Sequence, residues 1–381
     1  MGYKKLYLEA EKQLKIVEDE IGQAEYLRKL AEDERNQAEE RLLQDEHQNQ
    51  KTTFEEFIDC CHTFLSEPLK IQTDRKLTTN GSLTNPSGRY CPTYLRPWSD
   101  FHSLQQQVFD SAYRFLQPPG EAPSRLLPSR GCLQYLGESV CRQQLASEAD
   151  LATYERSAVQ NQVYDAITTL RSIPAAQEAF HLGAEIRFDK SSNAIYIAEN
   201  GDRILLYTVE YKPAHKLSAE YLRSGLREMN FGEDVIQRVK ISNDGEERLK
   251  FNADQLTRAA VAQVYDGMIR DGLAYACLTN GYCTVFFHVH EDNPETLYYF
   301  LSEPKMDVET ANDETYFRQS ITAVGRMLSF CLMSVGSTPR SQEWRHRDKL
   351  KKWTMDFDHA LRQIQRMQLL QAPNASLHLP L

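Results

Sequence analysis

Long apolar runs are missing from this 381-residue chain, and no stretch approaches the roughly 18–20 apolar residues that span a bilayer. The charged N-terminus also lacks the apolar segment of a secretory signal, so we expect no membrane contact. A net charge of −10 argues against a uniformly basic nucleic-acid binder, although a local basic groove remains compatible with it. The eight cysteines form no CxxC pair, which favours reduced, mostly buried thiols in an intracellular protein. The choice between nucleus and cytoplasm stays open.

Several catalytic templates are absent as well. The chain has no Gly-rich phosphate loop, no HExxH, no GxSxG and no kinase signature set. The nearest approach to a metal cluster is Cys60-Cys61-His62, but adjacent ligands without a second cluster at finger spacing are a weak signal for zinc.

Residues 3–51 are almost without Gly and Pro and rich in Glu, Lys, Gln, Ala and Leu. A heptad places Tyr7, Leu14, Ile21 and Leu42 at a, and Val17, Ala24, Ala31 and Ala38 at d. Arg28 and Arg35 also fall at a, so the seam is stronger in its first half. The pattern predicts a coiled-coil helix over residues 1–51 that pairs with itself or with a partner helix. A solvated single helix with i,i+4 ion pairs is the alternative.

Residues 52–130 read as a helical segment and linker that pack against a larger domain. Thr52 or Thr53 caps a short helix with an apolar stripe, and a second helix is expected from Trp98 to Leu116. Between them, the stretch from Thr73 to Pro97 is rich in Thr, Asn, Gly, Ser and Pro and is predicted to be a loop or linker.

Residues 131–381 alternate helical and strand patterns and predict a mixed α/β fold. Helices are expected at 133–143, 148–172, 218–229, 254–271, 320–334 and 341–370. Strands are expected at 185–188, 194–198, 204–211, 274–278, 283–290 and 297–301. Basic residues between 340 and 352 are interpreted as the solvated face of the last helix rather than as a nucleic-acid surface.

The strand that ends at Pro213 carries the best chemical clue. Side chains two residues apart on a strand point the same way, so Glu210 and Lys212 lie side by side on one face. A surface ion pair is the plain alternative to a functional site.

The context of this pair resembles the PD-(D/E)xK, or restriction-endonuclease-like, nuclease superfamily. Glu210-Tyr211-Lys212 ends the third strand of a meander, a helix bearing Gln263 follows, and the next strand turns through residues 278–281, LTNG. The stretches TTFEEF (52–57), RPW (96–98), 209–217 and PRSQEW (339–344) resemble more closely a fungal family in which such a domain occurs alone or ahead of a kinase-like domain. The resemblance covers roughly residues 52–366. It implies a restriction-endonuclease-like mixed sheet flanked by helices and the activity of a metal-dependent endonuclease.

In this superfamily an Asp and the Glu of the E-x-K motif hold Mg²⁺, and the Lys places the attacking water or offsets charge. Glu210 and Lys212 match these positions, so the resemblance implies catalytic roles for both and metal ligation by Glu210. The Asp does not match cleanly, because residues 190–193 read KSSN where the family has Pro-Asp. Asp189 is the nearest substitute as a catalytic residue and second metal ligand, and a turn residue is its plain interpretation.

Two further residues are candidates for substrate binding. Gln263 lies on the small-residue side of its helix and would face the site, although a structural hydrogen bond is at least as good an interpretation. His215 follows Pro213 close to Lys212 and would touch a phosphate, although a solvated loop histidine is the favoured interpretation.

Two functions follow from the sequence. The first is a nuclease-like protein that hydrolyses DNA or RNA with Mg²⁺ at a degenerate metal site. The second is a non-catalytic coiled-coil scaffold or interaction protein, a pseudo-nuclease. The distinction depends on whether a second carboxylate reaches Glu210.

Overall fold

The structure is a computed structural model, and it describes residues 2–79, 85–142, 144–183, 185–189, 193–197, 201–231, 245–337 and 348–353. Outside the described residues lie residues 190–192, most of the helix expected at 341–370 and part of the basic cluster between 340 and 352.

An eight-stranded mixed sheet forms the centre of the molecule, with the strand order β4-β5-β6-β8-β9-β10-β2-β7. Its strands are β2 (Tyr94–Pro97), β4 (Glu185–Phe188), β5 (Ala194–Ile197), β6 (Arg203–Tyr211), β7 (Met229–Asn230), β8 (Tyr275–Thr279), β9 (Thr284–His290) and β10 (Asn293–Ser302). Strands β4 to β6 and β8 to β10 are two antiparallel meanders, joined side by side through the parallel pair β6–β8. The long helix α10 (Gly245–Asp271) precedes β8 and makes the crossover that a parallel pair requires. The expected mixed α/β fold is confirmed.

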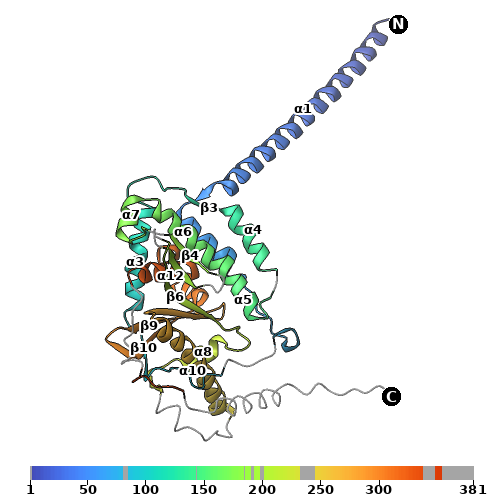
Figure 1. Cartoon of the computed structure of the whole chain (residues 1–381). Coiled ribbons are helices and arrows are strands. Elements are labelled where there is room, and N and C mark those ends of the chain that lie inside the picture. The colour runs from blue at the N-terminus through green and yellow to red at the C-terminus, as the bar shows by residue number, and fades with distance from the viewer. Residues whose placement is uncertain are drawn as a thin grey trace, which may run out of the picture.

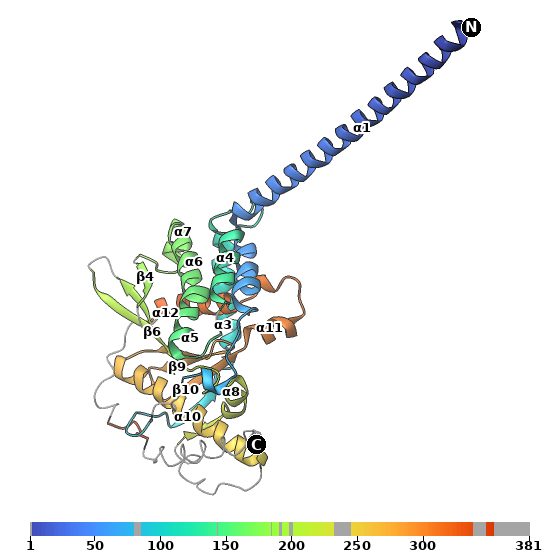
Figure 2. The ribbon, with the colours of Figure 1, turned by 90° about the vertical axis from the view of Figure 1, so that its right-hand side faces the viewer.

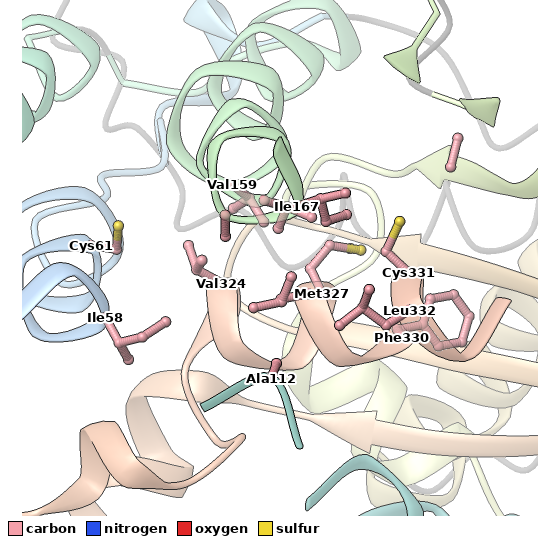
Figure 3. Packing of buried hydrophobic residues seen from close by; sticks show 14 of the residues in the cluster. Ile58, Cys61, Ala112, Val159, Ile167, Val324, Met327, Phe330, Cys331 and Leu332 are labelled. Atoms are coloured by element: carbon pink, nitrogen blue, oxygen red, sulfur yellow. The ribbon is translucent and has the colours of Figure 1, made fainter. Parts of the chain in front are cut away.

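One face of the sheet is covered by the helices α2 (Phe54–Cys60), α3 (Phe101–Leu116), α5 (Glu148–Glu155), α6 (Asn161–Arg171) and α12 (Ala323–Val335). Helix α12 is buried almost all round, so it lies in the middle of this layer. Figure 3 shows Val159 and Ile167 facing Val324 and Met327 of α12, with Ile58 of α2 to the left of Val324. Residues from 52–130 and from 131–337 therefore share one hydrophobic core.

The opposite face is covered by α8 (Ala219–Gly225) and α10. The α10 segment Ala259–Ala262 is fully buried, and its small side chains let the helix approach the sheet closely. Gly225 of α8 is required for the packing of these two helices, because a Cβ there would collide with Thr257 of α10. The three layers, helices, sheet and helices, are visible in Figure 1 and Figure 2.

The smaller elements complete the body. They are β1 (Lys51–Thr52) paired with β3 (Leu127–Ser129), the helices α4 (Arg130–Val140), α7 (Pro174–Ala179) and α11 (Pro304–Ala311), and the short helical turns η1 (Cys61–Ser66), η2 (Arg75–Leu77), η3 (Arg156–Gln160) and η4 (Tyr316–Arg318). Among the described residues, no helix combines the length and apolar character needed to cross a bilayer.

The prediction of a loop from Thr73 to Pro97 was wrong at its end, because Tyr94–Pro97 forms strand β2 inside the sheet. Leu95 is completely buried there. Pro97, which lacks an N–H, is tolerated because β7 pairs only with Tyr94 and Leu95. Four residues are too few for a period-2 pattern to stand out from the Pro- and Ser-rich stretch before them.

The N-terminal helix α1 (Gly2–Asn49) projects from the body, as Figure 1 and Figure 2 show. It contains no buried residue. Only its last turns approach the body, where Gln48 lies against Gly131 of α4. The sequence expectation of a long N-terminal helix is confirmed.

Candidate functional site

Glu210 and Lys212 lie at the C-terminal end of β6, next to the central parallel pair of the sheet. Glu210 pairs with Leu278 and Tyr211 pairs with Thr279 across β6 and β8. Because side chains alternate along a strand, Glu210 faces α10 whereas Tyr211 and Thr279 face the α5–α6 layer. The contacts of these side chains agree with that assignment.

Three side chains meet at one carboxylate oxygen. The Lys212 Nζ donates to Glu210 Oε1 at 2.5 Å, and Gln263 Nε2 of α10 donates to the same oxygen at 2.6 Å. The Lys212 side chain is only 3% exposed and that of Glu210 is 27% exposed. We call Glu210, Lys212 and Gln263 the Glu210 cluster.

The cluster has unused hydrogen-bonding capacity. None of the described residues donates to the second carboxylate oxygen of Glu210, and Gln263 Oε1 is buried with no partner among them. Buried polar atoms normally have a partner, so this acceptor is one that a bound water or a ligand donor would satisfy. A buried ammonium that is held by one carboxylate is also a suitable donor of a charge-assisted hydrogen bond to a phosphate oxygen.

The LTNG turn fixes the end of the strand that carries Lys212. The Lys212 N–H donates to the Thr279 carbonyl, and Asn280 Nδ2 donates to the Leu217 carbonyl, each at 3.0 Å. Asn280 Oδ1 accepts from two backbone N–H groups of the turn, and Gly281 adopts φ +91°. The turn therefore ties the loop 213–217 to β8 and holds the Glu210 cluster in place from behind.

Sequence reasoning missed Glu155 as a neighbour of this strand end. The predicted continuous helix 148–172 is interrupted by η3, a π-helical turn between α5 and α6. Its i→i+5 hydrogen bonding brings Glu155 and Gln160 to about the same face, whereas a regular helix would separate them. Gln160 Nε2 donates to the Tyr211 hydroxyl at 2.8 Å, and Glu155 Oε1 accepts from the Thr279 hydroxyl at 2.9 Å. No sequence signal marks a π turn here.

Burial raises the pKa of Glu155 to about 7, and the hydrogen bond from Thr279 partly opposes this rise. Glu155 lines a cavity of about 120 Å³, to which Arg326 of α12 and Lys305 of α11 also contribute. No member of the Glu210 cluster lines this cavity, because Glu155 lies on the opposite face of the sheet. Glu155 is therefore a neighbour of the cluster through the backbone and not a second ligand beside Glu210.

Asp189 is not brought to the Glu210 cluster. Its carboxylate accepts from the backbone N–H of Asn193 at 2.9 Å and from Asn193 Nδ2 at 3.2 Å, within the β4–β5 connection. It follows β4, two strands away from β6, which corresponds to about 10 Å at ordinary strand spacing. The geometry is that of a turn residue, and its catalytic and metal-binding roles stay predictions.

His215 lies in the loop that follows Lys212 and is half-buried. Burial lowers the pKa of His215 below its usual value, and the neighbouring Lys216 adds to this effect. A neutral imidazole is thus favoured. Its predicted contact with substrate is not tested by the contacts of the described residues.

The described residues show no cluster of metal-ligating side chains, and magnesium binding stays a prediction. Within the described ranges, no group of three or more His, Cys, Asp or Glu side chains is close enough to hold a metal ion. Mg²⁺ prefers several oxygen ligands in near-octahedral geometry, and the Glu210 cluster supplies one carboxylate.

Comparison with known proteins gives a family match and a match to a curated fungal protein. Residues 193–343, which include the whole Glu210 cluster, match the family described as the Spore killer 2 N-terminal domain. The chain is also 27% identical over 347 residues to "Meiotic driver SPOK2" of Podospora anserina, a match that covers 77% of this chain and 44% of that protein. The chain thus spans less than half the length of this relative. No solved structure matches the chain significantly. The chain is therefore similar, over most of its own length, to a fungal meiotic driver.

Proposed function

We propose that this chain is a nuclease-like protein of the PD-(D/E)xK type that acts on the phosphodiester backbone of DNA or RNA at the Glu210 cluster. The observation that carries the proposal is the convergence of Lys212 Nζ and Gln263 Nε2 on Glu210 Oε1. The convergence occurs at the end of the third strand of a meander that follows a helix and precedes the α10 crossover. The similarity to the Spore killer 2 N-terminal domain over residues 193–343 supports a role for this region in a meiotic driver.

Each residue of the cluster has a role in this proposal. The Lys212 ammonium stabilises negative charge that develops on the phosphate, in a largely water-excluded position where such charge stabilisation is strong. Glu210 uses its second oxygen to orient the attacking water. Gln263 holds the Glu210 carboxylate against α10, so it is a positioning residue.

Magnesium is the cofactor that the nuclease assignment implies, and Glu210 would supply one ligand. Asp189, the predicted second ligand, is bound within the β4–β5 connection and does not reach Glu210 there. A single carboxylate offsets the dehydration of Mg²⁺ poorly. The same observation favours the alternative function, a pseudo-nuclease that binds nucleic acid or a protein partner without cutting.

A cleavage assay separates the two functions. The full chain is incubated with supercoiled DNA, linear DNA and single-stranded RNA in Mg²⁺, Mn²⁺ or EDTA, alongside Glu210→Gln, Lys212→Met and Glu185→Gln. Glu185 is the matched control because it is a carboxylate on the same sheet that binds Arg187 and Tyr164. Metal-dependent cleavage that disappears with Glu210→Gln and Lys212→Met but survives Glu185→Gln supports the nuclease.

Other outcomes contradict it. Binding without cleavage by the wild type indicates the pseudo-nuclease, and equal cleavage by all three variants shows that the activity does not come from this cluster. Asp189→Asn completes the series, since a loss of cleavage equal to that of Glu210→Gln would establish Asp189 as a member of the site despite its position in the turn.

A further inference from the structure

The exposed helix α1 carries a row of glutamates along one side of its apolar seam. Glu11, Glu18, Glu25, Glu32 and Glu39 recur every seventh residue and occupy the e position of the heptad defined above. The g positions on the other side of the seam are Gln13, Glu20, Leu27, Glu34 and Arg41. In coiled coils the e and g residues set the choice and orientation of the partner.

This charge pattern disfavours pairing of α1 with a second copy of itself. In a parallel pair each g residue faces the e residue five positions later in the partner helix, so Glu20 meets Glu25 and Glu34 meets Glu39. In an antiparallel pair e faces e, and that row is entirely glutamate. A parallel self-pair also juxtaposes each of Arg28 and Arg35, at a, with its own copy. The parallel self-pair thus brings like charges together at two of its five g–e contacts and at both arginine a positions, and the antiparallel one does so along the whole e row.

The apolar seam is nevertheless open for a partner. Tyr7 is 71% exposed, Leu14 63%, Val17 50% and Ile21 53%. The helix stands clear of the body in Figure 1 and Figure 2, and no residue of it is buried. A continuous exposed apolar surface of this kind is typical of an interaction site.

We infer that α1 binds a helix from a different protein, one whose apolar seam is flanked by Lys and Arg and which presents acidic side chains opposite Arg28 and Arg35. Such a helix converts every unfavourable contact of the self-pair into an attractive one. The acidic flank thereby selects against self-association and for a basic partner. This inference is independent of the chemistry at the Glu210 cluster.

A charge-reversed copy of the chain tests the inference with a probe of known sequence. It carries Lys at the seven flanking glutamates and Glu at the two seam arginines, in the substitutions E11K, E18K, E20K, E25K, E32K, E34K, E39K, R28E and R35E. Sedimentation equilibrium then measures the mass of the wild type, of the charge-reversed chain and of their equimolar mixture, at low and at high salt.

We expect a monomer for each chain alone and a two-chain complex only in the mixture, weakened at high salt because the flanking charges are exposed. The matched control is a chain with E9K, D19K, D33K and E40K, which adds positive charge on other faces of the same helix. This control should bind the wild type at least about tenfold more weakly than the charge-reversed chain does. Its added positive charges lie away from the e and g positions, so they supply only non-specific electrostatic attraction.

Two results would overturn the inference. One is a wild-type chain that sediments as a dimer and becomes a monomer when residues 2–49 are deleted, which would show self-pairing through α1. The other is a mixture that stays monomeric, or that associates no better than the control, which would show that the flanking charges do not select the partner.

Discussion

The buried carboxyl of Glu155 makes the stability of the whole protein depend on pH. In the unfolded chain Glu155 has its ordinary pKa of 4.5, whereas burial raises it to about 7 in the folded chain. The gap between these values, at about 1.4 kcal/mol per pH unit, means that ionisation destabilises the folded state by about 3 kcal/mol. Between the two values the folded state binds more protons than the unfolded state, so this contribution to stability falls as pH rises.

Glu155→Gln removes the charge and keeps an oxygen that accepts from the Thr279 hydroxyl. The variant should therefore be more stable than the wild type at pH 8 by about 3 kcal/mol, and at pH 5 by less than about 1 kcal/mol. The stability difference between the variant and the wild type thus grows from pH 5 to pH 8. With an unfolding entropy of about 2 cal/mol/K per residue, this growth changes the difference between their Tm values by roughly 3 °C.

Differential scanning calorimetry of both proteins at pH 5 and pH 8 measures this shift. Low protein concentration is needed at pH 5, because the sequence pI is about 5.6. Glu148→Gln, in the first turn of the same helix but half-exposed, controls for the removal of one negative charge from α5. A Tm difference between Glu155→Gln and the wild type that is the same at both pH values would refute the reasoning.

Three stability predictions follow from the packing and hydrogen bonds. Gly137→Ala should lower the free energy of unfolding by about 2–4 kcal/mol in urea denaturation, because a Cβ there would collide with the Phe64 carbonyl; an unchanged midpoint would contradict the close packing of α4 on η1. Asn280→Ala should lower the free energy of unfolding by about 2–3 kcal/mol, because it leaves the Leu217 carbonyl and two backbone N–H groups of the turn without partners. Asn280→Asp retains an acceptor and is the control; a loss in Asn280→Ala no greater than in this control would argue against the prediction. Thr53→Ala should cost about 1 kcal/mol through the loss of the capping box of α2, and a thermal shift below the experimental error would be inconsistent with it.

Local patterns were sufficient for most of the fold. Strand β6 alternates apolar and polar residues up to Pro213, and helix α10 ends where expected because Gly272 adopts a positive φ of 69°. Strand β2 was not predictable, because its place in the sheet depends on β10, which is far away in sequence. A short strand of that kind is determined by tertiary pairing and carries little local signal.

The candidate site divides in the same way. The contact between Glu210 and Lys212 follows from the two-residue period of a strand, because side chains at i and i+2 lie on the same face. The contact between Gln263 and Glu210 also required the close approach of α10, which the small residues around it indicated. Glu155 was not predicted as a neighbour of the strand end, because the π-helical turn interrupts the continuous helix expected over residues 148–172.

The pairing of β2 with β10 has a consequence for how the chain folds. Tyr94 pairs with Thr296, so about 200 residues of chain must be made before β2 has its neighbour in the sheet. At the usual rate of translation of about 5–20 residues per second, β10 is synthesised roughly 10–40 s after β2, and Leu95 lacks this neighbour during that time. The sheet is therefore completed late, and a fragment that begins at residue 131 lacks one of its internal strands.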